Sequence, residues 1–463
     1  MDLVEILKRQ EGKTLEFKRD LSSPVKILRT IVAFANSSGG ILLVGVEDGT
    51  RNVLGVDAPL DAQEKLANII STGIAAPLMP AIEILPWRDT NLVVVEVFPS
   101  YSRPHYLVSA GQENGTYIRV GPSNRRADPL IQKELKRTAR NEAYDELPVP
   151  DLNSEALDFR AASELFVGRR VLTKKDLVSL HLVTRHQRRL VPTNGGIILF
   201  GLERASYFPD AWIQLGRFAG TTRARIADTR EIHDYLAEAV ELAVEFVRKH
   251  AELSYRIEGV RREERWSVPI PAIREAVVNA VTHADYSQRG SPIRVLVFDD
   301  RIVVESPGLL PFGLTIDDIQ RGVSKLRNRV IGRVFKELGL IEQWGSGIGR
   351  MIQACRAHGL KPPEFEEIGT HFRVTIRLEA RTRPEVDELG TQILKAIREA
   401  NGLSTKQVAE AVNISSRATR TRLKALVDKG LIVEIGSSPT DPKRAYFASG
   451  TAETGGAHHE QGF

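Results

Sequence analysis

Cysteine is almost absent from this sequence, and so are long apolar runs. Cys355 is the single cysteine among 463 residues, so no intrachain disulfide can form, which fits a reducing compartment. No stretch of about 18 uninterrupted apolar residues occurs, so no segment is expected to span a membrane. The chain begins with acidic, amphipathic residues instead of a basic and then apolar stretch, so no signal peptide is expected. Together these absences predict a cytoplasmic protein.

Several motifs are also missing. The sequence has no internal repeat and no Gly-x4-Gly-Lys-Ser/Thr phosphate loop, which argues against a P-loop helicase or motor. It has no Cys/His spacing typical of a zinc site. The net charge of +5 is a weak signal over this length. Lysine and arginine gather in four clusters, each as compatible with a solvated helix face as with a nucleic-acid contact: 119–140, 168–190, 321–333 and 417–424.

What the sequence does contain is typical of a globular protein. Apolar residues make up 42% and charged residues 27%, which is enough for sizeable cores. At roughly 100–200 residues per domain, the length predicts three or four domains. The alternation of helical and strand patterns predicts the α/β class, as an α+β multidomain chain. The expected parts are an N-terminal domain at 1–135, a helix-rich connector at 151–265 and a second α/β domain at 266–380. They are followed by a helical module with a β-hairpin at 388–449 and a disordered tail at 450–463.

The periodicity of the first 265 residues predicts individual elements. In the N-terminal domain we expect helices at 3–9 and 24–36, and strands at 14–18, 41–46, 92–98 and 117–121. The segment 131–150, which is charged and helical and then Pro-rich, is expected to be a linker. In the connector, 195–201 is expected to be a buried strand after a glycine turn, and 229–250 a long helix. We expect the connector to join its neighbours and to help the chain dimerise.

One helix of the second α/β domain carries polar side chains on an otherwise apolar segment. It is expected at 269–284, where Glu275, Asn279 and His283 recur at i, i+4 and i+8 and therefore share a face. An amide oxygen is a hard ligand for Mg²⁺, which favours oxygen atoms and phosphate co-ligands. A carboxylate one turn away can orient or deprotonate a water. This face therefore suits metal–phosphate chemistry.

The segment after this helix predicts an anion site with a lid. Strands are expected at 293–298 and 301–305, and the turn Ser306-Pro307-Gly308 ends them. Three glycines at 345–349 precede a helix that runs to residue 358, where free N–H groups and the helix dipole favour an anion. The basic connection 309–344 predicts a lid over this site. Three of its cations either reach a phosphate or form a solvated face: Lys325, Arg327 and Arg329.

These motifs resemble those of the GHKL ATPases, the superfamily of gyrase, MutL and histidine kinases. Glu275-x3-Asn279 matches the N box and 345–349 the second glycine box, over about 230–380. The resemblance is closest to the bacterial group often labelled RecG-like C-terminal, in which a Ser/Asn-Pro-Gly turn replaces the usual Asp-x-Gly-x-Gly box. It implies that Asn279 ligates Mg²⁺ and that Glu275 is the general base for ATP hydrolysis, with Glu305 as the candidate that reads adenine. The expected ATP-binding residues are Asn279, His283, Glu305, Gly308, Gly345, Ser346, Gly347, Ile348 and Gly349.

Acidic residues surround the first strands of the N-terminal domain. Glu11 and Glu16 flank the first strand, and Asp48, with Glu47 as the alternative, follows the next one. Carboxylates at adjacent strand ends can hold the divalent metals that phosphodiester cleavage requires, although surface carboxylates at strand ends are the plainer explanation. Lys18 is placed to contact a phosphate.

This stretch resembles the Schlafen AlbA-type domain over about 1–130. The resemblance rests on Glu11-x4-Glu16-Phe17-Lys18 and on the segments 33–36, 39–40, 45–49 and 117–121. In nuclease members two glutamates and an aspartate form the active site, which implies Mg²⁺ or Mn²⁺ at Glu11, Glu16 and Asp48. Many bacterial members are instead considered DNA-binding modules, so cleavage and binding alone both stay open. Lys18 and Arg119 are the expected nucleic-acid contacts.

The last module looks like a winged helix-turn-helix. Three helices are expected: one at 391–400, one that starts at residue 404, and one at 417–430 with Ser416 as its cap. The segments 431–434 and 444–447 are expected to pair as a wing. The third helix is expected to expose residue types that reach bases and phosphates: Arg417, Thr419, Arg420 and Lys424. Lys443 is expected at the tip of the wing. A winged helix that binds protein instead is the alternative.

These parts predict an ATP-binding, nucleic-acid-binding regulator in which a GHKL pocket controls a Schlafen AlbA-like domain. The alternative is an ATP-gated, metal-dependent nuclease that cuts RNA or DNA in phage defence. The expected cofactors are ATP and Mg²⁺, with Mn²⁺ as a substitute. The expected partners are DNA or RNA and further copies of the chain, in a homodimer or higher homo-oligomer.

Overall fold

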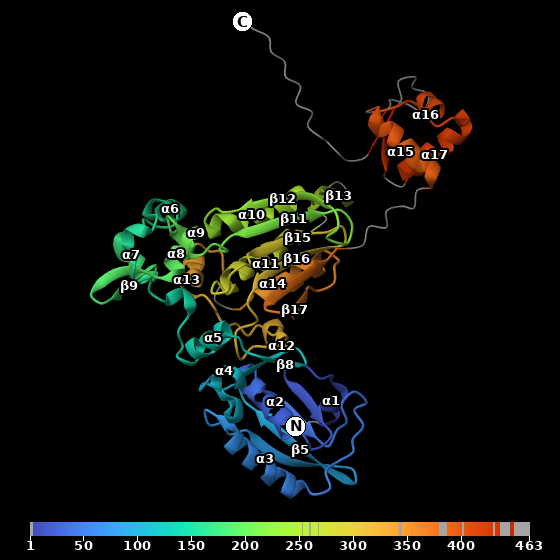
Figure 1. Ribbon diagram of the computed structural model, residues 1–463. Coiled ribbons are helices and arrows are strands. Elements are labelled where there is room, and N and C mark those ends of the chain that lie inside the picture. Colours follow the sequence, from blue (N-terminus) through green and yellow to red (C-terminus); the bar gives the residue numbers. More distant parts are fainter. Residues whose placement is uncertain are drawn as a thin grey trace. The chain divides into compact units, whose positions relative to one another are not determined.

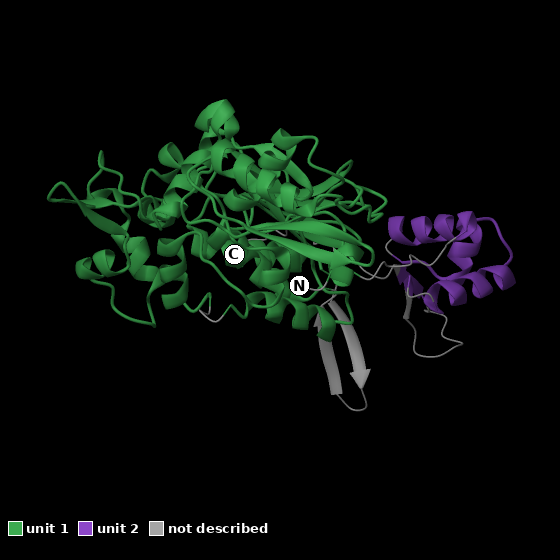
Figure 2. Cartoon of the chain, turned by 90° about the horizontal axis from the view of Figure 1, so that it is seen from below, with its two compact units in different colours: residues 1–379 green, residues 380–463 purple. Residues whose placement is uncertain are grey.

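The computed structural model describes residues 3–251, 253–258, 261–266, 268–341, 345–378, 387–400, 402–428, 431–435 and 445–448. The chain divides into two compact units, 1–379 and 380–463 (Figure 2). Within the described ranges, no helix has both the length and the apolar character that crossing a bilayer requires.

Unit 1 begins with a four-stranded sheet in the order β1-β2-β5-β4. Its strands are β1 (Leu15–Lys18), β2 (Gly40–Val44), β4 (Ala81–Trp87) and β5 (Thr90–Val97); β1 and β2 are parallel and the other pairs antiparallel. Side chains alternate between the two faces of a strand. Leu42 therefore packs with α2 (Pro24–Asn36) and α3 (Pro59–Gly73), whereas Leu43 packs with α1 (Leu3–Lys8) on the other face.

Shorter elements complete this first part of the unit. They are β3 (Ile74–Ala75), β6 (Tyr106–Leu107), α4 (Gly111–Gly115), β7 (Tyr117–Val120), β8 (Ser123–Arg126) and α5 (Pro129–Ala139). Every element predicted for 1–135 is present, with ends that differ by at most two residues. The elements α3, β3, β4, β6, α4 and β8 were not predicted. The predicted α/β, multidomain fold class is confirmed.

The second part of unit 1 is built on a six-stranded sheet in the order β12-β11-β15-β16-β18-β17. The strands are β11 (Ile213–Phe218), β12 (Ile226–Ile232), β15 (Ile293–Val297), β16 (Arg301–Pro307), β17 (Glu364–Ile368) and β18 (His371–Arg377). The pair β11 and β15 is parallel, and the other pairs are antiparallel.

Three helices cover one face of this sheet: α10 (Leu236–Lys249), α11 (Ile270–His283) and α14 (Gly347–Ala357) (Figure 1). The central helix, α11, contacts both of the others and also β16. This position explains why α11 is apolar on most of its surface, with Ile273, Val277 and Val281 fully buried. Two of its polar residues pair with the neighbouring helices: Arg274 with Glu241 of α10 and Glu275 with Arg350 of α14.

Smaller elements lie around this sheet. They are α6 (Phe159–Leu165), α7 (Lys174–Ser179), β9 (Val183–His186), β10 (Arg189–Pro192), α8 (Asn194–Phe200), α9 (Arg204–Tyr207), β13 (Leu253–Glu258), β14 (Arg261–Trp266), α12 (Ile316–Gln320) and α13 (Arg329–Glu337). The strands β9 and β10 form one hairpin, and β13 and β14 another.

Two predictions for the connector were wrong. Residues 195–201 do not form a strand, because α8 occupies them: the Thr193 hydroxyl caps this helix by accepting a hydrogen bond from the N–H of Gly196. Gly196 is there for close packing, since a Cβ would lie 2.1 Å from the carbonyl oxygen of Leu182. The helix expected from residue 229 begins only at Leu236, because 226–232 form the edge strand β12.

The sheet also extends across the boundary predicted between residues 265 and 266. Its strands β11 and β12, and the helix α10 that packs on it, all come from the segment assigned to the connector. The short apolar run of β11 gives no sign, by itself, of which strand it will pair with. The six strands of this sheet and the three helices that cover it therefore all come from the segment 213–377.

Unit 2 holds three helices and a hairpin. They are α15 (Glu388–Glu399), α16 (Thr405–Ala411), α17 (Ser416–Asp428), β19 (Ile432–Ile435) and β20 (Ala445–Ala448), with the two strands antiparallel. Ile393, Leu423 and Tyr446 are among the residues that form its core. The predicted helix-turn-helix and wing are present. Lys443 at the predicted wing tip and the predicted disordered tail, 450–463, lie outside the described residues.

Candidate functional site

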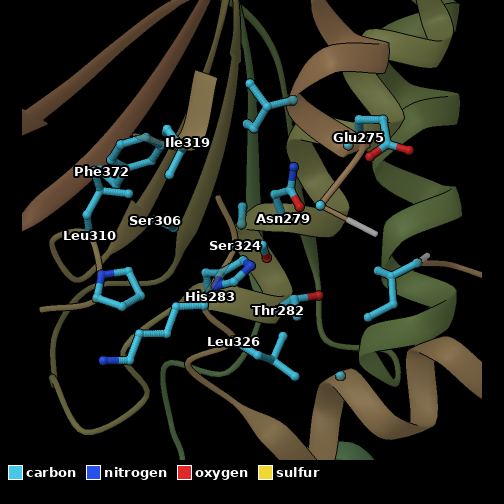
Figure 3. A pocket seen from close by; sticks show the side chains of 18 of the residues that line it. Glu275, Asn279, Thr282, His283, Ser306, Leu310, Ile319, Ser324, Leu326 and Phe372 are labelled. Carbon is cyan, nitrogen blue, oxygen red and sulfur yellow. The ribbon is translucent and has the colours of Figure 1, made fainter. Parts of the chain in front are cut away.

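A cavity of about 800 Å³ opens beside α11 in unit 1. Figure 3 shows Glu275, Asn279 and His283 along one helix, on the opposite side of the cavity from Phe372, Leu310 and Ile319. The remaining walls come from the end of β16, from the segment 308–341 and from the start of α14. The volume lies within the range of about 300–1,000 Å³ that is usual for small-molecule sites.

The predicted base Glu275 is held by an arginine. Arg350 of α14 donates two hydrogen bonds to Glu275 Oε1, from Nη2 at 2.8 Å and from Nε at 3.1 Å. Asn279, one turn further along α11, also lines the cavity, and its amide makes no hydrogen bond with a described residue. The amide oxygen is therefore available to a ligand, whereas the carboxylate is engaged.

His283 is placed in the cavity wall as predicted. Burial and the positive charge of Arg327 lower the pKa of His283 to about 4. The imidazole is consequently neutral at physiological pH. It can exchange hydrogen bonds with a ligand but adds no positive charge to the cavity.

The glycine-rich segment before α14 reaches the cavity only in part. Gly345, Gly347 and Ile348 line it, as does Gly308 from the turn after β16. Ser346 and Gly349 are not among the lining residues: Ser346 is the N-cap of α14 and accepts a hydrogen bond from Arg350, and Gly349 is exposed. For these two residues the predicted ligand contact is corrected, since Ser346 is engaged by Arg350 and Gly349 lies on the side of the turn that faces solvent.

Glu305, the predicted adenine-reading acid, faces away from the cavity. Neighbouring strand residues point to opposite faces of a sheet, and Val304 and Ser306 are the residues of β16 that line the cavity. Glu305 is buried on the other face, where Arg223 and Arg373 each donate a hydrogen bond of 2.9 Å to its Oε1. Ser306, the next residue along β16, lines the cavity instead.

The basic segment 309–341, called the lid below, lines the cavity and carries α12 and α13. Arg327 points elsewhere, because its guanidinium donates to Glu134 and to the carbonyl of Leu309. Arg329 lines the cavity but is engaged by Glu146 and Asn141. Lys325 also lines it and donates to the carbonyl of Phe312 at 3.1 Å.

Two residues that the sequence did not single out have unpaired polar atoms at the cavity. Thr282 of α11 and Arg333 of α13 both line it. The hydroxyl of Thr282 and Nη1 of Arg333 are buried without a hydrogen-bond partner. The helical spacing of Arg329, Arg333 and Lys336 was the signal that could have identified Arg333.

In the N-terminal domain the three predicted acids are neighbours. Burial raises the pKa of Glu11, and the charges of Glu16 and Asp48 raise it further, against a backbone hydrogen bond from Phe17 that lowers it. Within the described ranges, however, no group of three Asp, Glu, His or Cys side chains is placed to hold a metal ion. Both oxygens of Glu16 are already occupied, by Lys18 and by Arg119. Mg²⁺ and Mn²⁺ therefore do not fit these acids as they are placed.

The two predicted phosphate contacts of this domain are also engaged. Arg119 is 1% exposed and donates hydrogen bonds to Glu16 and Asn124 and to the carbonyls of Gly12 and Leu15. It joins β7 to β1 and cannot reach a nucleic acid, which corrects the prediction. Lys18 is partly exposed, and its ammonium pairs with Glu16.

In unit 2 the predicted basic face of the third helix is exposed. Arg417, Arg420 and Lys424 are all exposed on α17. Thr419 was wrongly predicted to be exposed, because it is fully buried and its hydroxyl donates to the carbonyl of Ser415. The side chain of Ser415, not that of Ser416, accepts a hydrogen bond from the N–H of Ala418.

Three family models match separate parts of the chain. The model "Schlafen, AlbA_2" matches residues 11–128, "Putative ATP-dependent DNA helicase recG C-terminal" matches 290–376, and "Winged helix-turn-helix DNA-binding" matches 386–433. The predicted domain architecture is confirmed. The chain therefore joins domains of ATP-binding and nucleic-acid-binding types.

Two solved structures are similar to the chain. One is the crystal structure of the DIP2311 protein from Corynebacterium diphtheriae, at 20% identity and a TM-score of 0.41, covering 94% of this chain and 92% of that chain. The other is the N-terminal domain of a RecG-related protein from Nitrosomonas europaea, at 26% identity and a TM-score of 0.22, covering 27% of this chain and 91% of that chain.

The RecG-like match contains only part of the cavity wall. It begins at residue 290 and includes the end of β16, the lid and the glycine-rich segment. Glu275 and Asn279 precede it, on α11. The structure nevertheless brings α11 and the RecG-like domain together around one cavity.

Proposed function

We propose that the chain is an ATP-binding, nucleic-acid-binding regulator in which nucleotide in the cavity controls the Schlafen AlbA-type domain. The observation that carries the proposal is the position of the lid. One side of the lid lines the cavity, and its other side contacts the Schlafen AlbA-type domain and the segment that follows it.

The cavity fits a nucleotide. Its volume accommodates one, and the unpaired hydroxyl of Thr282 and the guanidinium of Arg333 are polar groups that require a partner. Bound Mg²⁺ would neutralise phosphate charge, and the free amide oxygen of Asn279 suits that ion. Glu275 would orient a water, and both hydrogen bonds that it accepts from Arg350 go to Oε1.

The contacts between the lid and the Schlafen AlbA-type domain are both apolar and polar. Phe312 of the lid packs in one cluster with Ile118, Val120 and Leu135, and the guanidinium of Arg103 lies 5.4 Å from the centre of its ring. The Ser38 hydroxyl donates to the carbonyl of Leu314 at 2.8 Å, and Leu314 itself lines the cavity. A ligand that moves the lid therefore moves these contacts.

Hydrogen–deuterium exchange with and without ATP and Mg²⁺ tests the coupling. We expect ATP to change exchange in the lid and also in residues 117–139. Asn279→Ala should abolish both changes because it removes the free amide from the cavity. Phe312→Ala should retain ATP binding and the change in the lid but lose the change at 117–139. If ATP protects the lid alone in the wild type, nucleotide does not control the other domain.

Cleavage of nucleic acid by the Schlafen AlbA-type domain is a second candidate function. It is favoured by the closeness of Glu11 and Asp48, although Glu16 is taken up by two cations. Asp48→Asn is the sharper test, since Asp48 is exposed, whereas loss of Glu16 would leave the buried Arg119 without its acid. Cleavage of RNA or DNA with Mn²⁺ that Asp48→Asn abolishes, with binding unchanged, would support a nuclease. Binding without cleavage would leave the domain a binding module.

Self-association of the chain remains part of the proposal. The strand β12 pairs only with β11 among the described strands, and six of its seven residues are exposed or half-buried. Sedimentation of the purified chain at several concentrations would show whether it forms a dimer.

A further inference from the structure

One helix of the lid, α13, presents a cationic side to the cavity. Val330, Ile331, Val334 and Phe335 are fully buried and pack into the core of unit 1. The opposite side of the helix lines the cavity through five residues: Arg329, Gly332, Arg333, Lys336 and Glu337. The burial of these four apolar residues therefore determines which side of α13 faces the cavity.

The start of α13 is also held firmly. The buried carboxylate of Asp145 accepts hydrogen bonds from the backbone N–H groups of Arg329, Val330 and Ile331, at 2.9, 2.6 and 3.0 Å. These are three of the four N–H groups that a helix leaves without an internal partner. Asp145 therefore caps α13 from another part of the chain and fixes the backbone that carries Arg333.

Positive charge outweighs negative charge around the cavity. Its wall contains five cationic side chains, Lys325, Arg329, Arg333, Lys336 and Arg350, and two acidic ones, Glu275 and Glu337. Both acids already have a partner. Glu275 pairs with Arg350 of the wall, and Glu337 pairs with Arg170, which does not line the cavity. Burial and the neighbouring arginines Arg103, Arg329 and Arg327 lower the pKa of Lys325. The wall is thus electropositive, with five cationic side chains against two acidic ones.

Arg333 is the unpaired cation in this wall. Its guanidinium makes no hydrogen bond or ion pair with a described residue, and its Nη1 is shielded from solvent. Arginine is always charged and has five N–H donors, and a buried charged donor without a partner is unfavourable. Arg327 and Arg329, by contrast, are each paired with a glutamate. An anion with several acceptor oxygens would both satisfy these donors and neutralise the charge.

We propose that Arg333 binds the polyphosphate chain of the nucleotide in this cavity and so makes the site selective for nucleotides over nucleosides. The inference rests on the proposed nucleotide function and adds a residue from the lid to it. Charged hydrogen bonds to phosphate are among the stronger ones, and planar guanidinium groups match phosphate geometry. Because Asp145 caps the same helix, phosphate bound at Arg333 also acts on the segment that leads back to the Schlafen AlbA-type domain.

Binding measurements on the full chain separate the phosphate contact from the rest of the site. Affinities for ATP, ADP, adenosine and inorganic tripolyphosphate would be measured by calorimetry on the wild type, Arg333→Gln and Arg333→Lys. We expect Arg333→Gln to weaken ATP and tripolyphosphate about tenfold to a hundredfold and to leave adenosine unchanged. Arg333→Lys should restore part of the loss because it keeps the charge.

The control is Arg321→Gln, since Arg321 is an exposed arginine of the same lid that does not line the cavity. It should bind all four ligands as the wild type does. An unchanged ATP affinity in Arg333→Gln, or an equal loss for adenosine, would overturn the assignment. If the wild type itself binds none of the ligands, the proposed nucleotide function fails, which is a different result. Circular dichroism and thermal unfolding would show that each variant is folded.

Discussion

A methyl group placed at Gly347 tests where a ligand sits in the cavity. Gly347 is the first residue of α14 and lines the cavity. A Cβ at this position would lie 2.7 Å from Oε2 of Glu275 and 3.6 Å from Nδ2 of Asn279. The first distance is shorter than real contacts, so in Gly347→Ala the carboxylate of Glu275 must move. The added methyl also takes up the space between the two predicted key residues.

The effect on stability should be small, while the effect on binding should be large. Alanine in place of glycine in a helix gains up to about 1 kcal/mol, and less at the first turn. Disturbing a partly exposed ion pair such as Glu275–Arg350 costs about 0–1 kcal/mol, so the two terms nearly cancel. Crowding of a well-packed site costs about 1–3 kcal/mol, which corresponds to a loss of ATP affinity of roughly fivefold to 150-fold.

Gly349→Ala is the matched control, because a Cβ there meets nothing within 4 Å. It should gain the same helix propensity and bind ATP as the wild type does. Affinities would be measured by calorimetry and stabilities by urea unfolding. If Gly347→Ala binds ATP normally, the start of α14 is not part of the ligand site. If both variants lose affinity equally, the loss comes from the glycine backbone and not from the occupied space.

Three further changes test other parts of the structure. Arg417→Ala together with Arg420→Ala should lower the salt slope of DNA binding by about 0.9 per lost phosphate contact, and an unchanged slope would favour a protein partner for the winged helix. Burial raises the pKa of Asp145 from 3.8 to about 7, so its contribution to stability is complete below about pH 4 and is lost as the pH rises through 7. The free energy of unfolding of the wild type should therefore fall relative to that of Asp145→Asn as the pH rises through this window, by about 1.4 kcal/mol per pH unit and up to about 4 kcal/mol in all. A difference between the two proteins that stays constant with pH would refute this. Phe335→Ala removes a fully buried ring of α13 and should cost about 3–5 kcal/mol in urea unfolding; a smaller cost would mean that α13 is loosely packed.

The sequence predicts those parts of the fold that local patterns determine. Residues 269–284 show the helical period, with polar residues on one face, and the structure places Glu275, Asn279 and His283 in one cavity wall. The helix-turn-helix follows from caps such as Ser404, whose hydroxyl accepts a hydrogen bond from Gln407. Such features depend only on residues a few positions apart.

Other features depend on residues far apart in the sequence, and these could not be predicted. The run 194–200 is apolar enough for a strand or a buried helix, and packing against Leu182 decides for the helix. Arg119 has the composition of a phosphate contact, but its partner Glu16 lies on another strand and buries it. Glu305 could have been assigned correctly, because Val304 and Ser306 on either side of it already define the opposite face.

The order of strands in the six-stranded sheet has a consequence for how the protein folds. The parallel partner of β11 is β15, which follows it only after α10, the β13–β14 hairpin and α11. Pairings between distant segments form slowly, because the entropy of closing the loop is lost before the contact is gained. During synthesis, β11 and the apolar side of α10 must wait for residues up to 377 before the sheet is complete. A fragment that begins at residue 266 would lack β11, β12 and α10, and would leave the buried side of α11 exposed. The segment predicted to be a connector therefore supplies part of the packing that holds α11, the helix that carries Glu275 and Asn279.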